Sequence, residues 1–370
     1  MSGTLRNWPS VTLGEVCEFK YGKSLPEAAR AGGDVPVFGS NGEVGRHDEA
    51  LTDGPTIIIG RKGSFGEVAY STVGCWPIDT TYYVDGTATK VDLRWLAYRL
   101  SALGLNTLNR AAAIPGLNRE DAYRQRLLLP PLPEQRRIAM ILEKADALRA
   151  KSRAALAQLD TLAQSIFLDM FGDPAANPKG WPRKHISDIA TVITGNTPSR
   201  ANPDYYGHAI EWIKSDNINT PNYYLTRADE GLSELGRQVG RAVPAGSILV
   251  TCIAGSPDCI GNSAMTDREV AFNQQINAIV PFEGNAHFIY GQLRVAKCLV
   301  QQASTAGMKG MVSKSRFERI SLILPPSQLQ EIYVERVCAV EEAMSKQRVS
   351  FDRLGELFAS LQYRVFRGEL

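Results

Sequence analysis

Side chains able to pair with the edges of DNA bases occur in short polar clusters along this sequence. Arg, Lys, Asn and Gln carry the paired donors and acceptors that base reading needs, whereas Lys, Arg, Ser, Thr and backbone amides position phosphates. The run Asn273-Gln274-Gln275 places three amides in succession and is the most typical of base reading. These residue types predict contacts with DNA.

The polar clusters fall into two groups, one in each half of the chain. In the first half we expect contacts from Lys23, Ser40, Asn41, Arg61, Lys62, Ser64, Thr81 and Tyr82. In the second half we expect them from Thr197, Ser199, Arg200, Lys214, Asn217, Asn273, Gln274, Gln275, Lys309, Lys314 and Arg316. Asn, Gly and Ser also form turns, so each cluster alone fits either role, while the set as a whole favours DNA contact.

The overall charge gives little support to strong DNA binding by the chain alone. The formal net charge is +2 at pH 7, from 41 Lys and Arg against 39 Asp and Glu. Since neutralised phosphates supply much of the affinity for DNA, we expect weak binding by the isolated chain and a gain of affinity from partners. Nanomolar binding that weakens steeply with salt, measured on the isolated chain, would overturn this hypothesis.

Motifs that would mark an enzyme are absent from the sequence. No two of the 32 glycines are separated by a single residue, which excludes the GxGxxG fingerprint and the similar turn of methyltransferase cofactor sites. The four histidines lack HExxH spacing, and Asn202-Pro203-Asp204-Tyr205 only superficially resembles the Asn-Pro-Pro-Tyr motif of adenine methyltransferases. We therefore expect no catalytic residue, no cofactor and no metal in this chain.

The sequence also predicts a cytoplasmic location. The first residues form no basic-then-apolar leader, and no apolar run approaches the roughly 20 residues needed to cross a bilayer. The cysteines are scattered without a CxxC pair, as expected for reduced thiols. They are Cys17, Cys75, Cys252, Cys259, Cys298 and Cys338.

An internal repeat fixes the architecture. Trp8-Pro9 recurs as Trp181-Pro182, a shift of 173 residues (181 − 8). Phe171 recurs as Phe366, a shift of 195 residues (366 − 171), so the second copy carries 22 more residues in its middle (195 − 173). A repeat of this length predicts one scaffold that is built twice.

Each copy begins with a Gly-, Asn- and aromatic-rich region and continues into a long helical region. Residues 56–60 and 82–85 are strand candidates, and residues 93–108 form an amphipathic stretch. We expect an α+β fold with two mixed α/β globular domains, residues 1–131 and 174–326, and two spacer helices, residues 132–173 and 327–370.

Apolar residues at alternating steps of three and four predict that the two helical regions form a coiled coil. The positions that we expect in its seam include Ile141, Leu148, Leu159, Leu162, Val340, Phe351, Leu354 and Leu361. The first helix leaves the first globular domain and arrives at the second. The second helix can therefore bury its seam on the first only by running back, so we expect an antiparallel pair.

Several segments resemble the target-recognition domains of type I restriction-modification specificity subunits. They are residues 36–42 with 58–64 (Pro-Val-Phe-Gly-Ser-Asn-Gly and Ile-Ile-Gly-Arg-Lys-Gly-Ser), and residues 194–199 with 205–207 and 210–213. Residues 129–139, which open a long helix, and Phe171-Gly172-Asp173 at its end are similar to the central spacer of that family. The second spacer departs from this pattern, with Ser327-Gln328-Leu329-Gln330 where the first has Leu132-Pro133-Glu134-Gln135.

The resemblance, which covers essentially the whole chain, implies that each globular domain reads one half of a bipartite double-stranded DNA target and that the helices set the gap. It also implies that two modification subunits carrying S-adenosylmethionine dock on this chain and methylate adenine, and that a translocating restriction subunit can join them. Since the middles of the two copies differ in length and sequence, we expect an asymmetric target.

Two other interpretations fit parts of the sequence. The chain could be the recognition half of a methyltransferase or nuclease with activity of its own, which methylation by the purified chain with cofactor alone would indicate. It could also be a coiled-coil protein adaptor. In that case, exchanging the globular domains between homologous chains would leave the DNA target unchanged.

Overall fold

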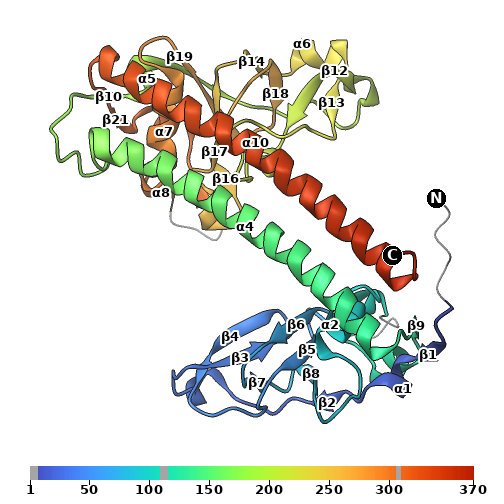
Figure 1. The fold of residues 1–370 in the computed structure, drawn as a ribbon. Helices are drawn as coiled ribbons and strands as arrows, with labels where there is room; N and C mark the ends of the chain where they lie inside the picture. The colour runs from blue at the N-terminus through green and yellow to red at the C-terminus, as the bar shows by residue number, and fades with distance from the viewer. Residues whose placement is uncertain (1–6, 109–115, 306–309) are drawn as a thin grey trace. The chain divides into compact units, whose positions relative to one another are not determined.

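The computed structural model describes residues 7–108, 116–305 and 310–370, which adopt an α+β fold (Figure 1). Two compact units make up the chain, and each contains one globular domain and parts of both long helices. Unit 1 comprises Met1–Arg153 and Val349–Leu370, and unit 2 comprises Ala154–Arg348. The expected fold class is confirmed.

The globular domain of unit 1 is built on a four-stranded antiparallel sheet in the order β2-β8-β5-β6. Its strands are β2 (Lys20–Tyr21), β8 (Thr81–Asp85), β5 (Thr56–Gly60) and β6 (Val68–Ser71). A second sheet contains β4 (Gly42–His47), β3 (Val35–Gly39) and β7 (Trp76–Pro77), and β1 (Ser10–Thr12) pairs with β9 (Arg126–Leu128). The short helices are α1 (Leu13–Val16), α2 (Leu93–Ser101) and α3 (Arg119–Tyr123).

The core of this domain forms where β5 meets α2. Every residue of β5 is buried, and Trp95 and Leu100 of α2 belong to the same apolar cluster as Ile57 and Ile59. The Asp92 side chain caps α2 by accepting a hydrogen bond from the Trp95 backbone amide at 2.9 Å. The helix ends earlier than the predicted amphipathic stretch, because Gly104 adopts a left-handed φ of +66° and turns the chain.

The globular domain of unit 2 repeats this arrangement with additional elements. Its four-stranded sheet contains β11 (Ala190–Thr194), β19 (Ile276–Pro281), β15 (Ile248–Thr251) and β17 (Ser263–Met265). A second sheet contains β13 (Gly231–Leu232), β12 (Tyr206–Ile213), β18 (Val270–Phe272) and β14 (Ala242–Val243). Short ribbons pair β10 (Arg183–His185) with β21 (Ser321–Ile323) and β16 (Ile253–Ala254) with β20 (Gly310–Met311). The short helices are α5 (Ile186–Ile189), α6 (Glu234–Val239), α7 (Ala286–Val295), α8 (Cys298–Gln302) and α9 (Lys314–Glu318).

The strand registers of the two domains coincide under the shifts found in the sequence. Lys20 pairs with Tyr83 in unit 1, and Ile193 pairs with Ala278 in unit 2, which are the same positions moved by 173 (193 − 20) and 195 (278 − 83). The parallel pairs β3 with β7 and β12 with β18 also correspond. Most of the insertion of the second copy falls between β12 and β15 and includes α6 and β14. The repeat in the sequence is therefore a repeat of the fold.

The two long helices are α4 (Leu132–Phe171) and α10 (Ser327–Phe366), each of 40 residues. In unit 1 the beginning of α4 packs against the end of α10, through Leu142 and Val365. In unit 2 the end of α4 packs against the beginning of α10, through Phe167 and Val337. The helices therefore run antiparallel, as expected.

The seam of α10 follows the predicted spacing, whereas that of α4 departs from it. Val340 is buried and Phe351, Leu354 and Leu361 are partly buried, as are Ile141 and Leu159 of α4. Leu148 and Leu162 are 52% and 47% exposed, so their placement in the buried seam was wrong. Neighbouring positions are buried instead, because α4 packs against the globular domains as well as against α10. These positions include Leu142, Ser152, Ala163 and Phe167.

Each long helix is anchored at its start by one buried glutamine. Gln135 accepts a hydrogen bond from the backbone amide of Asp92 at 2.8 Å and donates one to the Pro130 carbonyl at 2.8 Å. In unit 2, Gln330 accepts from the backbone amide of Asn285 at 2.9 Å and donates to the carbonyl of Pro325 at 2.8 Å. The second helix therefore keeps this anchor although its first residues differ from those of α4.

No helix among the described residues combines the length and the apolar composition needed to cross a membrane.

Candidate DNA interface

Three loops of the unit 1 domain converge at one edge of its four-stranded sheet. They are residues 22–24 after β2, residues 61–66 after β5 and residues 77–80 before β8. The Gly22 amide donates to the Thr81 carbonyl at 3.1 Å, and the Arg61 amide donates to the Thr80 carbonyl at 2.9 Å. We call this region the loop edge of unit 1.

The same three loops meet in unit 2. They are residues 195–197, 252–254 and 272–275, which we call the loop edge of unit 2. The Gly195 amide donates to the Ile276 carbonyl at 3.1 Å, and the Cys252 amide donates to the Gln275 carbonyl at 2.8 Å. The polar clusters around Thr80 and Gln275 thus occupy equivalent places in the two domains.

A glycine is required in the first loop of both edges because another backbone lies too close. A Cβ atom on Gly22 would lie 2.1 Å from the carbonyl oxygen of Ile78, and one on Gly195 would lie 2.1 Å from that of Asn273. Real Cβ contacts do not reach such distances. Both glycines therefore hold their loop edge in a fixed shape.

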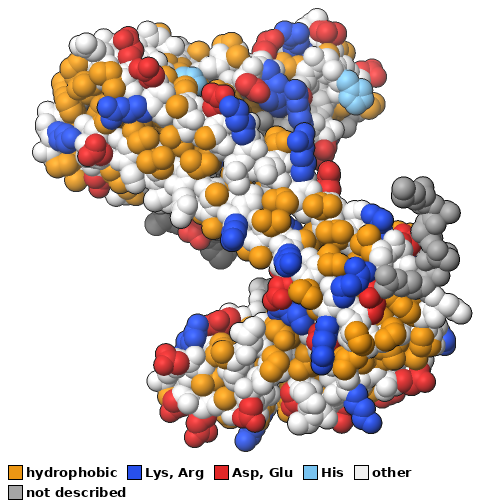
Figure 2. Space-filling view, in the orientation of Figure 1, with side chains coloured by type: hydrophobic (Ala, Val, Ile, Leu, Met, Phe, Trp, Pro, Cys, Tyr) orange, Lys and Arg blue, Asp and Glu red, His pale blue; other side chains and the backbone are white. Residues whose placement is uncertain are grey.

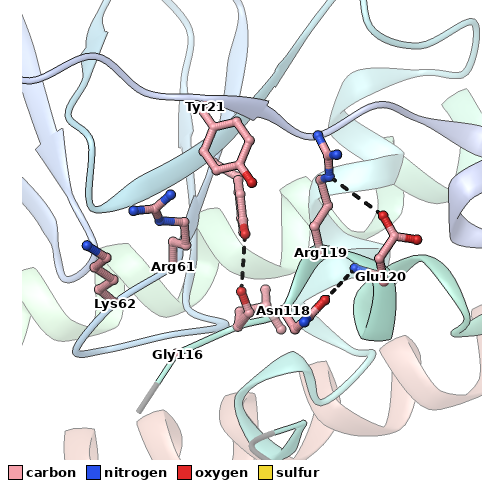
Figure 3. A pocket seen from close by; sticks show the side chains of 9 residues that line it. Tyr21, Arg61, Lys62, Gly116, Asn118, Arg119 and Glu120 are labelled. Atoms are coloured by element: carbon pink, nitrogen blue, oxygen red, sulfur yellow. Dashed lines mark hydrogen bonds and ion pairs between the residues drawn. The ribbon is translucent and has the colours of Figure 1, made fainter. Parts of the chain in front are cut away.

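A basic hollow opens at the loop edge of unit 1 (Figure 3). It has a volume of about 580 Å³ and is lined by Tyr21, Arg61, Lys62, Tyr82, Gly116, Leu117, Asn118, Arg119 and Glu120. Among the described residues, Arg119 makes only a long contact of 4.0 Å with Glu120, while no ion pair of Arg61 or Lys62 is found. The hollow therefore carries an excess of positive charge suited to an anionic or acceptor-rich ligand.

Tyr21 lies between two guanidinium groups at this hollow (Figure 3). The Cζ atoms of Arg61 and Arg119 lie 5.2 and 5.5 Å from the centroid of its ring, and Arg61 also lies 5.8 Å from that of Tyr82. The hydroxyl of Tyr82 donates to the Leu117 carbonyl at 3.2 Å, and burial, with a smaller contribution from Tyr21, raises the pKa of Tyr82 to about 12. Tyr82 thus stays neutral at physiological pH, and both rings orient the cations that lie against them.

The exposed predicted residues of unit 1 surround this region. Lys23, Asn41 and Ser64 are exposed, and the ammonium of Lys23 lies 5.7 Å from the ring of Trp76. The hydroxyl of Ser40, which is partly buried, donates to the backbone at 2.6 Å and so fixes the turn between β3 and β4. The side chains of Lys23, Asn41 and Ser64 are available to a ligand, whereas Ser40 is bound to the Thr80 carbonyl.

Three predicted contact residues have buried side chains. Thr81, Tyr82 and Asn273 are only 0%, 4% and 7% exposed. The Thr81 hydroxyl donates to the Ile78 carbonyl at 2.8 Å, and the Asn273 side-chain oxygen accepts from the Gln275 amide at 3.0 Å. These side chains shape the loops instead of facing solvent, which corrects the expectation of direct contact. Thr81 and Tyr82 lie in β8 and Asn273 directly follows β18, and the local polar pattern concealed the burial of these side chains.

In unit 2 a charged cluster covers two aromatic rings. The Arg200 guanidinium lies 4.3 Å from the ring of Tyr206 and 5.1 Å from that of Trp212, over which Lys214 also lies at 5.6 Å. The Glu230 carboxylate accepts hydrogen bonds from Arg200 at 2.7 Å and Lys214 at 2.6 Å. The bonds from Lys214 and then Arg200 lower the pKa of Glu230. Arg200 and Lys214 are thus both paired with a carboxylate, whereas no ion pair of Arg61 or Lys62 is found among the described residues.

The amide run of unit 2 joins two neighbouring loops. Thr197 donates to the side-chain oxygen of Gln274, and both side chains are exposed. The side-chain oxygen of Gln275 accepts hydrogen bonds from Ser215 at 3.3 Å and Asn273 at 3.1 Å. The loop edge of unit 2 therefore presents uncharged hydrogen-bonding side chains, whereas the loop edge of unit 1 presents cations.

The remaining predicted residues of unit 2 have different surroundings. Ser199 is exposed, and Asn217 closes its own turn through hydrogen bonds to the backbone. On α9, Lys314 is 3.6 Å from a carboxylate oxygen of Glu318, and Arg316 donates weakly to a backbone carbonyl at 3.4 Å. Lys309 lies outside the described residues.

Several residues at these surfaces were not predicted from the sequence. They are Tyr21, Asn118, Arg119, Tyr206, Trp212 and Glu230. The repeat itself could have identified Arg119, which is the predicted Lys314 moved back by 195 positions (314 − 195). No comparable signal identifies Glu230, because it lies between β12 and β15, where the shift between the two copies changes from the 173 to the 195 found in the sequence.

Positive and negative side chains are mixed over the face of both units seen in Figure 2. This agrees with the small net charge of +2.

A family model described as the type I restriction modification DNA specificity domain matches this chain twice, over residues 6–159 and 178–349. The two matches follow the two copies of the internal repeat. Each match therefore includes one globular domain and part of a long helix.

Two curated relatives are specificity subunits of type I restriction enzymes. The HindI subunit of Haemophilus influenzae is 31% identical over 199 residues, which cover 52% of this chain and 42% of that protein. The MjaIX subunit of Methanocaldococcus jannaschii is 33% identical over 110 residues, which cover 29% of this chain and 24% of that protein. The matched stretches thus span less than half of either relative.

Two solved structures share the fold over nearly the whole chain. The type I restriction-modification S subunit from M. genitalium has a TM-score of 0.61 at 15% identity, covering 99% of both chains. A chain from a structure on complex assembly and conformational transition of the type I R-M system has a TM-score of 0.53 at 15% identity, covering 99% of this chain and 100% of that one. At such identities these likenesses concern the fold.

Proposed function

Because this chain belongs to the family of type I restriction modification DNA specificity domains, we propose that it selects the DNA target of such a system. Each globular domain reads one half of a bipartite double-stranded target. The chain itself is not catalytic, and it acts by choosing and orienting the DNA that partner subunits modify or cut.

The loop edge, built twice with different side chains, is the observation that carries this proposal. Gly22 and Gly195 hold equivalent loops in equivalent places. Unit 1 presents Arg61 and Lys62 there, whereas unit 2 presents Thr197 and Gln274. Since base edges are distinguished by their pattern of donors and acceptors, two such edges select different bases, and the target is asymmetric.

The two long helices act as the spacer between the half sites in this proposal. The functional borders are residues 1–131 and 174–326 for the recognition domains and residues 132–173 and 327–370 for the spacers. The buried anchors Gln135 and Gln330 fix the start of each helix to its own globular domain. Matched insertion of heptads into both helices will lengthen the gap and leave both half sites unchanged.

The partners in this proposal are DNA, two modification subunits that supply S-adenosylmethionine and methylate adenine, and, where the system has one, a restriction subunit that translocates DNA. The complex acts in the cytoplasm. The small net charge of +2 supports weak DNA binding by this chain alone and a gain of affinity on assembly.

The test is to express the chain with its modification subunits and to map methylated adenines across the genome of the host. We expect one asymmetric bipartite motif. Replacing residues 1–131 with those of a homologous chain should change one half of the motif, and replacing residues 174–326 should change the other. A motif that survives both exchanges would indicate a protein adaptor, and methylation by this chain with cofactor alone would indicate an enzyme.

A further inference from the structure

The side chain of Arg61 at the basic hollow has no acidic partner among the described residues. Its Nε atom is buried without a hydrogen-bond acceptor, and its contacts are to the rings of Tyr21 and Tyr82. Aromatic rings attract a cation but cannot accept all of its five N–H donors. An external group with several acceptors is therefore needed to satisfy this guanidinium.

The backbone amide and the backbone carbonyl of Arg61 both make hydrogen bonds. Its amide donates to the Thr80 carbonyl at 2.9 Å, and its carbonyl accepts from the Leu117 amide at 2.9 Å. A Cβ atom on Gly60 would lie 2.2 Å from the Ser64 carbonyl oxygen, so the turn that follows packs tightly against the strand end. Two ring contacts of the side chain and two hydrogen bonds of the backbone thus fix the direction of the planar guanidinium group of Arg61, which we call its fork.

The other two cations of the hollow differ from Arg61. Lys62 is exposed, and no hydrogen bond or ion pair of its ammonium is found among the described residues. Arg119 lies 5.5 Å from the ring of Tyr21 and 4.0 Å from a carboxylate oxygen of Glu120. A flexible point charge suits a phosphate, whereas a preset planar fork suits two acceptors that lie side by side.

We infer that Arg61 reads a guanine in the half site bound by unit 1, while Lys62 contacts a phosphate of the same half site. This inference rests on the proposed function and names the base that the hollow selects. In the major groove guanine presents two adjacent acceptors, N7 and O6, whereas adenine presents an acceptor beside a donor. A guanidinium, which has donors alone, pairs through both ends of its fork with guanine.

Unit 2 lacks this device. The residues that follow β15 at the place of Arg61 and Lys62 are Cys252 and Ile253, whose backbone makes the same hydrogen bonds. Neither side chain carries a positive charge or a guanidinium group. The guanine read by Arg61 therefore belongs to one half site alone and contributes to the asymmetry of the target.

The experiment uses the assembled complex of this chain with its modification subunits and duplexes that carry the mapped motif. Each guanine of the unit 1 half site is replaced by 7-deazaguanine, which lacks the N7 acceptor but pairs normally. With the unaltered chain we expect methylation to fall about 5- to 150-fold at one position. Arg61→Ala should lose this difference between guanine and 7-deazaguanine, and Arg61→Lys, which keeps the charge but has a single ammonium in place of the fork, should reduce it.

Two further variants separate base reading from charge. Lys62→Ala should weaken methylation of all sequences alike and reduce the salt dependence of DNA binding by about one unit of slope. Lys346→Ala removes an exposed lysine of α10 in unit 2 and should leave unit 1 discrimination unchanged. Thermal melting of each variant shows whether the fold is kept.

The inference is wrong if Arg61→Ala retains full discrimination, or if both Arg61 variants lower methylation of every sequence equally and reduce the salt slope as Lys62→Ala does. A unit 1 half site without guanine also overturns it. A complex that methylates no bipartite motif, or whose motif survives exchange of the globular domains, instead removes the proposed function, so the two failures can be told apart.

Discussion

The two globular domains share their strand registers but differ in the side chains that they expose at the loop edge. Gly22 and Gly195 each lie close to a backbone carbonyl at an equivalent position of the repeat, and Gln135 and Gln330 make equivalent pairs of hydrogen bonds. At the loop edge, cations in unit 1 stand where uncharged side chains stand in unit 2. Positions that satisfy the backbone are thus kept between the copies, whereas positions that face a ligand are free to diverge.

The charged groups of the two domains differ in the same way. In unit 1 the cation Arg61 rests on aromatic rings, while in unit 2 Arg200 and Lys214 share the carboxylate of Glu230. Glu230 lies in the longer stretch of the second copy, between β12 and β15. The additional residues therefore change the electrostatics of unit 2 as well as its size.

The largest expected effect concerns Phe171 and Phe366, which are the same position of the repeat. Phe171 packs in unit 2 against Phe167, Phe288 and Tyr333 at centroid distances of 5.0 to 5.7 Å, whereas Phe366 in unit 1 has one aromatic neighbour at 6.5 Å. We expect Phe171→Ala to lower the free energy of unfolding of unit 2 by about 3–5 kcal/mol. Phe366→Ala should cost unit 1 less, because it removes fewer ring contacts.

Urea unfolding followed by hydrogen exchange in each unit measures the two losses separately. Equal losses in both units would contradict the expected order and would show that the aromatic neighbours of Phe171 add little to its burial.

The next effect tests the glycines of the two loop edges. Gly22→Ala and Gly195→Ala each force a Cβ atom against a carbonyl oxygen, so each should cost its own unit about 1–3 kcal/mol. Gly86→Ala and Gly255→Ala are matched controls, since a Cβ atom at these glycines meets nothing within 4 Å. Thermal melting of the four variants measures the effect. Tolerance of alanine at one loop edge alone would mean that the two edges are not built alike.

The buried glutamines should give equal effects in the two units. Gln135→Leu and Gln330→Leu each leave a backbone amide and a carbonyl without their partner, which costs about 1–3 kcal/mol. The exposed Gln158 of α4, replaced by Leu, serves as the control. Calorimetry that shows a loss for Gln135→Leu only would mean that α10 does not depend on its anchor.

The smallest effect concerns an ion pair of unit 2. Burial would raise the pKa of Glu211, but hydrogen bonds from Arg268 and Arg227 outweigh it and lower that pKa to about 2, from its ordinary value of 4.5. Because the folded-state pKa is the lower one, the stabilisation is present above pH 4.5 and is lost as the pH falls toward 2. Glu211→Gln should therefore cost unit 2 about 1–2 kcal/mol at pH 7, after allowance for partial exposure.

Acid titration of unfolding checks this prediction. The difference between Glu211→Gln and the unaltered chain should shrink between pH 4.5 and 2 in unit 2 and be absent in unit 1. A difference that stays constant over this range would show that the carboxylate charge is not the cause.

The sequence predicted most of the scaffold. The strand over residues 56–60, the start of the long helices at residues 132 and 327 and their antiparallel direction all agree with the structure. The heptad pattern failed for Leu148 and Leu162, which are exposed. Periodicity identifies an apolar stripe on a helix, but the face that is buried also depends on what else packs against it.

The candidate site was predicted in outline and not in detail. Arg61, Lys62 and Gln274 were identified because donors in polar turns are visible in a linear sequence. Thr81 and Asn273 were misjudged for the same reason, since a polar side chain beside a turn can point to the core and bond to the backbone. Tyr21 gave no signal because its role depends on two arginines distant in the sequence.

The sequence by itself determined that one scaffold occurs twice, that each copy ends in a long apolar-striped helix and that common catalytic motifs are absent, because these are properties of local spacing and of self-similarity. Only the tertiary structure decided that Arg61 and Arg119 of unit 1 gather around Tyr21, with no acidic partner of Arg61 among the described residues, while Arg200 and Lys214 of unit 2 are paired with Glu230. Charge compensation and burial depend on long-range strand pairing, which brings together residues that the chain keeps far apart.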